Sequence, residues 1–279
     1  MKNLFSNEFI TDLARLQPLF VAAQPFPHIV IENFLEVELC ARLLHDFPSF
    51  EKRYALNEMG QVGGKAVRMD MPSISPSFAE LDAFLQTAEF LSAIARLTGI
   101  KDLLYDSDYI GGGTHENVQG QALDAHVDFN VLPKSGWHRR LNLILYLNPE
   151  WHSEWGGCLC LESDPWDAEH ADKVEIVPKF NRCAIFETSE VSWHGFPAIE
   201  LPDTNRGETR KSIAIYIVHP HPASRADCTV AWHGVCAARP ATRLGTGHSP
   251  VCGTIFRAAQ TFYTAERPAQ VSVSARIGI

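Results

Sequence analysis

An imidazole and a carboxylate lie two residues apart in the segment 125–129, Ala-His-Val-Asp-Phe. On an extended strand, residues i and i+2 project from the same face, so His126 and Asp128 are expected to converge on one point. A second imidazole, His194, follows 68 residues later in an apolar segment. Two histidines and one carboxylate that leave other coordination positions open suit non-haem Fe(II) and its oxygen chemistry. A zinc ion instead prefers a closed tetrahedral site or a single open position.

A cationic residue begins the apolar segment that follows His194. The segment 210–217 reads Arg-Lys-Ser-Ile-Ala-Ile-Tyr-Ile, and strand alternation places Arg210, Ser212 and Tyr216 on one face. An arginine drawn inward needs an anion, and its planar fork fits a carboxylate. A solvated arginine at a strand start is the alternative interpretation. Taken singly, a His-x-Asp pair or a lone histidine is more often structural, so the combination with Arg210 is what favours a functional site.

The elements that must position these residues are strands. From about residue 104 the apolar pattern alternates with a period of two, and turn residues separate the segments. The strands are expected at 104–110, 122–127, 139–147, 157–162, 173–177, 182–187, 192–196 and 210–218. Because the helical patterns collect before these strands, a mainly β fold with flanking α-helices is predicted: an antiparallel sandwich or jelly-roll barrel buttressed by N-terminal helices.

The first hundred residues show helical periodicity instead. Helices are expected at 3–17, 37–47 and 77–98, with a short strand at 28–31 and Gly99 as the cap of the last helix. Segments rich in glycine and proline are expected to be loops. These loops are 50–75, 111–120 and 129–138, and their shapes are expected to set the choice of substrate.

Five motifs in this order resemble one enzyme family. They are His126-Val127-Asp128, the run 140–151 with Tyr146-Leu147-Asn148, the segment 156–161 that starts with two glycines, His194, and Arg210-Lys211-Ser212. Over about residues 105–219 the chain resembles the Fe(II)/2-oxoglutarate-dependent dioxygenases of the prolyl-4-hydroxylase type. The segment from His28 to Phe47 also resembles the entry segment of bacterial members. This resemblance implies a double-stranded β-helix, or jelly-roll, core.

The resemblance also implies roles for particular residues. It assigns three metal ligands with a catalytic role, which are His126, Asp128 and His194. Arg210 is expected to bind the distal carboxylate of 2-oxoglutarate, and the Tyr146 hydroxyl to add a hydrogen bond to it. Asn142 shares the face of Tyr146 and is expected to line the same pocket. Tyr109 resembles a tyrosine near the cosubstrate in some members, although its spacing to the metal motif is longer than usual.

The implied cofactors are Fe(2+), 2-oxoglutarate as cosubstrate and O2, with ascorbate as a further candidate. The implied reaction hydroxylates an unactivated C-H of a small metabolite, a carrier-bound group or a peptide side chain, with succinate and CO2 as coproducts. Related halogenases replace the carboxylate of the metal motif with a small residue, so Asp128 favours hydroxylation, or a desaturation variant, over halogenation. Two alternatives are a cupin-like metal-binding or Zn-dependent hydrolytic protein without 2-oxoglutarate, and a catalytically inactive interaction module. A buried Arg210 would favour the oxygenase.

Composition excludes several other classes. The chain has 279 residues and a formal charge of −9, which is the wrong sign for binding nucleic acid through phosphates. No apolar run reaches the length of a membrane helix, and the N-terminus lacks the apolar segment of a signal peptide, so a cytoplasmic location without membrane attachment is expected. Seven cysteines without C-x-x-C spacing are expected to be reduced and packed.

The domain organisation follows from the change in pattern. We expect one oxygenase domain over residues 1–219, with a helical buttress at 1–100 and the jelly-roll core at 101–219. Residues 220–279 differ in charge from the rest of the chain, because they contain six arginines and only two acidic residues, Asp227 and Glu266. They are expected to form a C-terminal extension. This extension could also serve as an oligomer contact, so a homodimer is a candidate assembly.

Overall fold

Two antiparallel sheets form the core of the computed structural model, which describes residues 3–56, 60–132, 134–167 and 169–220. The larger sheet has the order β1-β9-β6-β11-β4-β2, with β3 paired to the end of β11. Its strands are β1 (His28–Ile31), β2 (Lys65–Arg68), β3 (Leu104–Tyr105), β4 (Gly113–Asn117), β6 (His138–Tyr146), β9 (Arg182–Glu187) and β11 (Arg210–His219). The smaller sheet has the order β5-β10-β7-β8. Its strands are β5 (Leu123–His126), β7 (Leu159–Glu162), β8 (Lys173–Ile176) and β10 (Trp193–Phe196).

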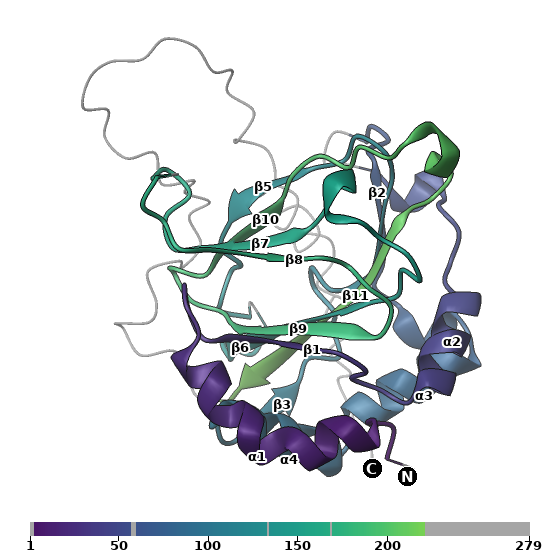
Figure 1. The fold of residues 1–279 in the computed structure, drawn as a ribbon. Coiled ribbons are helices and arrows are strands. Elements are labelled where there is room, and N and C mark those ends of the chain that lie inside the picture. Colours follow the sequence, from purple (N-terminus) through teal and green to yellow (C-terminus); the bar gives the residue numbers. More distant parts are fainter. Residues whose placement is uncertain (1–2, 57–59, 133, 168, 221–279) are drawn as a thin grey trace, which may run out of the picture. The chain divides into compact units, whose positions relative to one another are not determined.

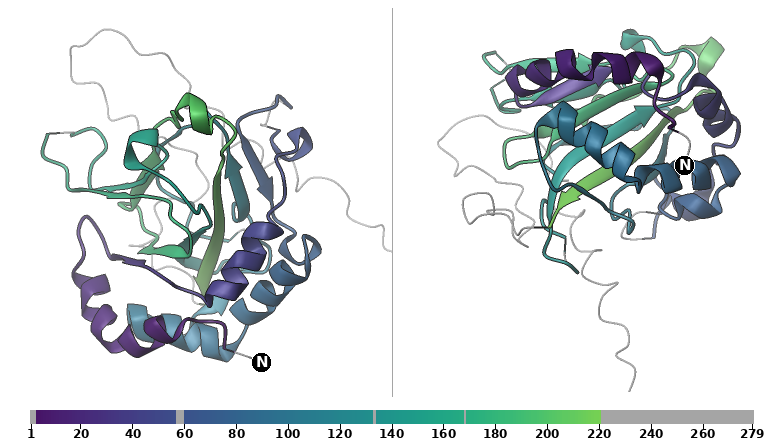
Figure 2. Two further views of the ribbon diagram at one scale, coloured as in Figure 1. Left: turned by 45° about the vertical axis from the view of Figure 1, so that its right-hand side comes forward. Right: turned by 90° about the horizontal axis from the view of Figure 1, so that it is seen from below.

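Helices cover the face of the larger sheet that is turned away from the smaller one (Figure 1). They are α1 (Asn7–Ala22), α2 (Val37–His45), α3 (Pro76–Leu85) and α4 (Ala88–Thr98). Seen from below, α1 and α4 lie across the strands (Figure 2). Four short 3-10 helices complete the described elements: η1 (Lys52–Tyr54), η2 (Met71–Ser73), η3 (Ser153–Trp155) and η4 (Asp203–Asn205). The predicted double-stranded β-helix with N-terminal helices is confirmed.

Strand alternation divides the larger sheet into an apolar face and a functional face. On β6, Leu141, Leu143 and Leu145 pack against the helices, whereas Ile144 and Tyr146 point toward the smaller sheet. The isoleucines of β11 likewise join the helix-side core. Each such side chain contributes roughly 1.5 to 3 kcal/mol on burial. Polar residues of β6 and β11 are therefore held on the opposite face, between the two sheets.

The expected helices form with different limits. The first helix continues past Pro18 to Ala22, and the expected helix 77–98 is two helices, because Thr87 caps α4 by accepting a hydrogen bond from the Phe90 amide. Gly99 ends α4 with a φ of 77°, as predicted.

Two segments that were expected to be loops contain strands, and this expectation was wrong. Residues 113–117 form β4, which pairs with β11 on one side and β2 (residues 65–68) on the other. Gly113 has a φ of 90°, and a Cβ there would lie 2.1 Å from the carbonyl oxygen of Arg68. The glycine that suggested a loop is needed because the two backbones approach closely.

The remaining expectations concern cysteines, membranes and the C-terminal segment. Cys40, Cys158, Cys160 and Cys183 are free and buried. Cys228, Cys236 and Cys252 lie outside the described residues, as does the expected C-terminal extension after residue 220. None of the helices in the described ranges combines the length and apolarity needed to span a bilayer.

Candidate active site

Two neighbouring strands of the smaller sheet, and the residues that follow the first of them, bring His126, Asp128 and His194 together. Strands β5 and β10 are antiparallel neighbours, and His126 is paired directly with His194. Asp128 follows two residues after the end of β5. The His126 Nε2 atom lies 3.9 Å from Asp128 Oδ1, and the His194 Nε2 atom lies 3.6 Å from Asp128 Oδ2. One ligand atom from each residue lies within 4.8 Å of the others, a spacing that could hold a metal ion.

Main-chain hydrogen bonds orient both imidazoles. The Nδ1 atom of His126 lies 2.9 Å from the carbonyl oxygen of Asp124, and Nδ1 of His194 lies 2.9 Å from that of Ser192. A carbonyl oxygen only accepts, so each Nδ1 must donate a proton, and in the neutral form of each ring the lone pair is then on Nε2. Both lone pairs are thus available beside Asp128, as in a metal ligand whose second nitrogen is fixed by a hydrogen bond.

The Asp128 carboxylate is buried and accepts two hydrogen bonds. Its side chain is 11% exposed. Asn142 Nδ2 donates to Oδ2 at 3.0 Å, and the Tyr216 hydroxyl donates to Oδ1 at 3.2 Å. Burial raises the pKa of Asp128, but His194, His126, Arg139 and the Asn142 hydrogen bond together hold it below its usual value. The carboxylate is therefore ionised and oriented before any ligand binds.

A fully buried arginine supports this arrangement from β6. The guanidinium of Arg139 lies 3.9 Å from the ring centroid of Phe129 and 3.6 Å from that of Tyr216. Its Nη2 atom donates to the carbonyl oxygen of Ile110 at 2.7 Å and lies 3.8 Å from Asp106 Oδ2. Stacking on the Tyr216 ring fixes the side chain whose hydroxyl contacts Asp128. Arg139 could not be recognised from the sequence, because an arginine at the start of a strand next to a second arginine is indistinguishable from a solvated pair.

Arg210 lies on the inner face of β11 and is only 3% exposed, so the surface alternative is excluded. Its Nε atom donates to the carbonyl oxygen of Gly157 at 2.7 Å, and Nη2 donates to the Tyr146 hydroxyl at 3.2 Å. The guanidinium also lies 4.4 Å from the ring centroid of Phe196. None of the ion pairs among the described residues involves Arg210. Burial without a carboxylate lowers its pKa, so this site favours an incoming anion.

Several buried polar atoms on the functional face have no hydrogen-bond partner. They are His115 Nε2, Asn117 Nδ2, Asn142 Oδ1 and Ser212 Oγ. Register places Ser212 beside both His115 of β4 and Tyr146 of β6. Burial, followed by the charges of Lys65 and Arg210, holds the pKa of His115 well below its usual value, so this imidazole is neutral. Unpaired buried polar groups are costly, and a polar cosubstrate would satisfy them.

Sequence reasoning missed His115 and Asn117 because they lie in the segment expected to be a loop. The sequence Gly-Thr-His-Glu-Asn lacks apolar residues with strand alternation. Its one usable signal is that residues 113, 115 and 117 share a face if the segment is extended.

The structure does not bring Tyr109 to this cluster. Its ring belongs to the helix-side core, and its hydroxyl donates to Asp82 Oδ1 at 3.0 Å and contacts the Tyr105 hydroxyl. The expected contact with the cosubstrate is therefore not supported by its placement. The physical reason is the left-handed turn at Tyr109, φ 48°, which precedes β4 and sends the side chain toward α3.

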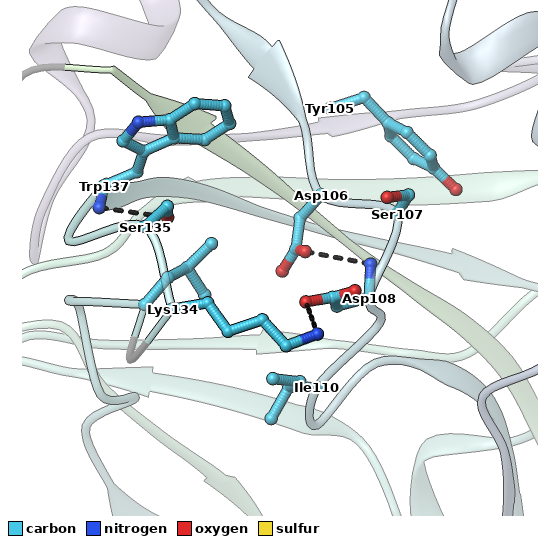
Figure 3. A pocket seen from close by; sticks show the side chains of 9 residues that line it. Tyr105, Asp106, Ser107, Asp108, Ile110, Lys134, Ser135 and Trp137 are labelled. Atoms are coloured by element: carbon cyan, nitrogen blue, oxygen red, sulfur yellow. Dashed lines mark hydrogen bonds and ion pairs between the residues drawn. The ribbon is translucent and has the colours of Figure 1, made fainter. Parts of the chain in front are cut away.

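A separate small cavity of about 120 Å³ lies beside the 105–110 segment (Figure 3). Lys134 at its rim pairs with Asp108 at 2.8 Å, and the Asp106 carboxylate accepts a hydrogen bond from the Asp108 amide (Figure 3). None of the three clustered residues His126, Asp128 and His194 lines this cavity. The cavity is connected to the candidate active site only through Asp106, whose carboxylate lies 3.8 Å from Arg139 Nη2.

The fold and the site define a metal-dependent oxygenase built on a double-stranded β-helix. Residues 113–218 match the model of the 2OG-Fe(II) oxygenase superfamily. The chain therefore contains a domain of the 2OG-Fe(II) oxygenase superfamily, and the protein is an enzyme of this class. The predicted resemblance is confirmed at the level of the superfamily. This match favours an oxygenase over the hydrolytic protein and the inactive module.

Solved structures agree on the fold. A prolyl hydroxylase from Trichoplax adhaerens, in complex with a hypoxia inducible factor oxygen degradation domain peptide fragment, has a TM-score of 0.51 at 16% identity. That match covers 76% of this chain and 93% of the other. The non-heme alpha ketoglutarate dependent epimerase SnoN from nogalamycin biosynthesis has a TM-score of 0.50 at 14% identity, covering 75% and 84%. No curated protein matches this chain.

Proposed function

We propose that this enzyme hydroxylates an unactivated C-H of its substrate with Fe(II), 2-oxoglutarate and O2, releasing succinate and CO2. The observation that carries the proposal is the pairing of two features on facing sheets. Two Nε2 lone pairs and an ionised carboxylate converge at one end of the space, and an unpaired guanidinium lies in the same interior. A metal at the first feature and a dicarboxylic acid reaching the second would satisfy both.

The residues present fit both groups. Two imidazoles and one carboxylate form the donor set of non-haem Fe(II) oxygenases, so His126, Asp128 and His194 would hold the metal. Arg210 and the Tyr146 hydroxyl would bind the distal carboxylate of 2-oxoglutarate, because a planar guanidinium binds a carboxylate through two hydrogen bonds. When bound, the metal and 2-oxoglutarate would activate O2, the oxidant, with oxidative decarboxylation of 2-oxoglutarate to succinate and CO2.

The chain's own contribution is orientation and exclusion of water. Asn142 and Tyr216 each donate a hydrogen bond to Asp128, which fixes the plane of the carboxylate. Phe196 and Tyr146 flank the Arg210 guanidinium, so an anion bound there is shielded from solvent. Its attraction to the guanidinium is therefore stronger than it would be in water. Retention of the carboxylate at position 128 supports hydroxylation rather than halogenation.

Anaerobic addition of Fe(II) and 2-oxoglutarate to the wild-type protein is expected to produce a weak visible charge-transfer band. The band requires that metal and cosubstrate bind together, so it reports both halves of the site without needing a substrate. The band is measured by an absorbance titration with 2-oxoglutarate. Succinate is the control, because it lacks the 2-oxo group and cannot chelate the metal in the same way. A flat spectrum with wild-type protein would contradict the proposed function.

Tyr216→Phe is expected to weaken Fe(II) binding about 10- to 100-fold, because groups that hydrogen-bond a metal ligand contribute this much to metal affinity. The change removes only the hydroxyl that donates to Asp128. Tyr105→Phe is the matched control, since it deletes the same atom where the hydroxyl contacts Asp82 instead. Metal affinity measured by competition with a chelator should separate the two variants, and equal affinities would show that the Tyr216 hydrogen bond is not used.

The substrate classes to test are those expected from the sequence. The Trichoplax enzyme was solved with a peptide, which makes a peptide side chain one candidate for this chain. Small metabolites and carrier-bound groups are the others. A screen for compounds that stimulate succinate formation distinguishes among them.

A further inference from the structure

A second cation lies on the functional face of the larger sheet. Lys65 of β2 is paired in register with Asn117 of β4, which is paired in turn with Arg210 of β11. Residues directly opposite in neighbouring antiparallel strands point to the same face. Asn117 contacts the Arg210 guanidinium through its side chain at 3.5 Å, so this row faces the interior. Lys65 therefore projects toward the same space as Arg210.

The surroundings of the Lys65 ammonium agree with this position. Burial and, to a smaller extent, the charge of Arg210 lower the pKa of Lys65, Asp128 opposes the shift, and the net result is a pKa of about 8. Asp128 is the one carboxylate among these causes. Since Asp128 already faces both imidazoles, the ammonium has no carboxylate of its own within the described part of the chain.

Charge balance indicates what this lysine is available for. The buried Arg139 lies 3.8 Å from the Asp106 carboxylate, so these two groups offset each other. Of the remaining groups, Asp128 supplies one negative charge, whereas Arg210, Lys65 and a divalent metal would supply four positive charges. Doubly charged 2-oxoglutarate leaves the site with one positive charge in excess. Arg210 already has the geometry to bind the distal carboxylate of 2-oxoglutarate, so the excess falls on Lys65. A half-buried charge without a counterion is unfavourable, and a negatively charged ligand group would balance it.

We propose that the substrate of this oxygenase is an acid whose anionic group binds to Lys65. This inference rests on the proposed function, because it places the substrate in the same interior as metal and cosubstrate. Two other roles for the lysine are possible outcomes of the test. Lys65 could bind 2-oxoglutarate together with Arg210, or it could only protect β2, an edge strand, against pairing with another chain.

The first test asks whether Lys65 is still free when the cosubstrate is bound. The protein is acetylated with an N-hydroxysuccinimide ester, anaerobically with Fe(II), with and without saturating 2-oxoglutarate, and the modified lysines are quantified by mass spectrometry. We expect Lys65 to react at a similar rate in both samples. Protection of about tenfold or more by 2-oxoglutarate would assign the lysine to the cosubstrate and overturn the proposal.

The second test asks whether the substrate must be charged. Matched pairs of carboxylic acids and their primary amides are compared for stimulation of succinate formation by the wild-type enzyme. We expect the acids of active pairs to stimulate and their amides not to do so. Lys65→Met should raise the KM for the active acid about 10- to 100-fold, the usual range for a charge-assisted hydrogen bond. Equal stimulation by acids and amides, or an unchanged KM in the variant, would overturn the proposal.

Two controls separate this proposal from the proposed function. Lys52→Met removes an exposed charge close to β2 and should leave the KM for the acid unchanged. The charge-transfer band of the Lys65→Met variant should appear at the same 2-oxoglutarate concentration as in the wild type. Loss of the band in the wild type would refute the oxygenase function, whereas an altered 2-oxoglutarate requirement in Lys65→Met would refute only the role of the lysine.

Discussion

Asp128→Ala is expected to abolish succinate formation and to lower Fe(II) affinity by more than about 100-fold. Loss of a metal ligand should cost more than the loss of a group that only hydrogen-bonds to a ligand, which costs about 10- to 100-fold. The reason is geometric. Asp128 lies between the two Nε2 atoms, at 3.9 and 3.6 Å, and contributes the negative charge of the site. Removing it leaves two imidazoles and no negatively charged ligand to balance a dication. Metal affinity and succinate formation are measured on the same preparation.

Asp124→Ala is the matched control for this prediction. Asp124 carries an exposed carboxylate on the same strand, and only its main-chain oxygen contacts His126. Deleting its side chain should leave metal affinity and succinate formation close to wild type. An active Asp128→Ala enzyme, or a loss of metal equal to that in Asp124→Ala, would place the metal elsewhere.

Arg210→Met is expected to raise the 2-oxoglutarate concentration needed for half-maximal binding by roughly 30-fold to several thousand-fold. Loss of one partner in a buried, hydrogen-bonded charge pair costs about 2 to 5 kcal/mol. The anaerobic charge-transfer band measures this directly, since it is titrated with 2-oxoglutarate alone. Fe(II) affinity should change little, because Arg210 is not among the three clustered ligand groups.

The same substitution should not destabilise the protein without cosubstrate. Arg210 is buried with neutral partners, and replacing a buried charge by an apolar side chain of similar length is often neutral or stabilising. Thermal unfolding of the ligand-free Arg210→Met variant should therefore occur at the wild-type temperature or above it. Lys211→Met, which alters the next side chain on the opposite face, is the control and should retain 2-oxoglutarate binding. If Arg210→Met bound 2-oxoglutarate as tightly as the wild type, Arg210 would be ruled out as the partner of the cosubstrate.

Much of the site follows from strand alternation. A period of two places His126 and Asp128 on one face of their strand and Arg210 on the inner face of β11. The apolar residues that alternate with the polar ones along each strand specify which face is buried. The strand His28–Ile31 has the limits that its apolar run and flanking residues predict. These predictions succeed because each depends on local sequence and on burial of one face.

The residues that were not predicted depend on pairing between distant strands. Lys65 and His115 lie in short polar segments whose strand structure comes from their neighbours β4 and β11, not from their own propensity. Arg139 is fully buried because two aromatic rings and a main-chain oxygen surround it, and none of these contacts is local in sequence. The direction of the Tyr109 side chain depends on backbone handedness in a turn, which the neighbouring sequence does not specify.

The orientation of both imidazoles depends on peptide oxygens, at Asp124 and Ser192. Substitutions of the exposed Asp124 side chain keep its main-chain oxygen in place as long as the strands pair. The Ser192 oxygen also depends on the turn in which the Ser192 hydroxyl hydrogen-bonds to Ser189. The orientation of the two imidazoles is thus set by the main chain, whereas the loops around the site are free to vary. Such a division lets selection reshape what the enzyme accepts without having to rebuild how it reacts.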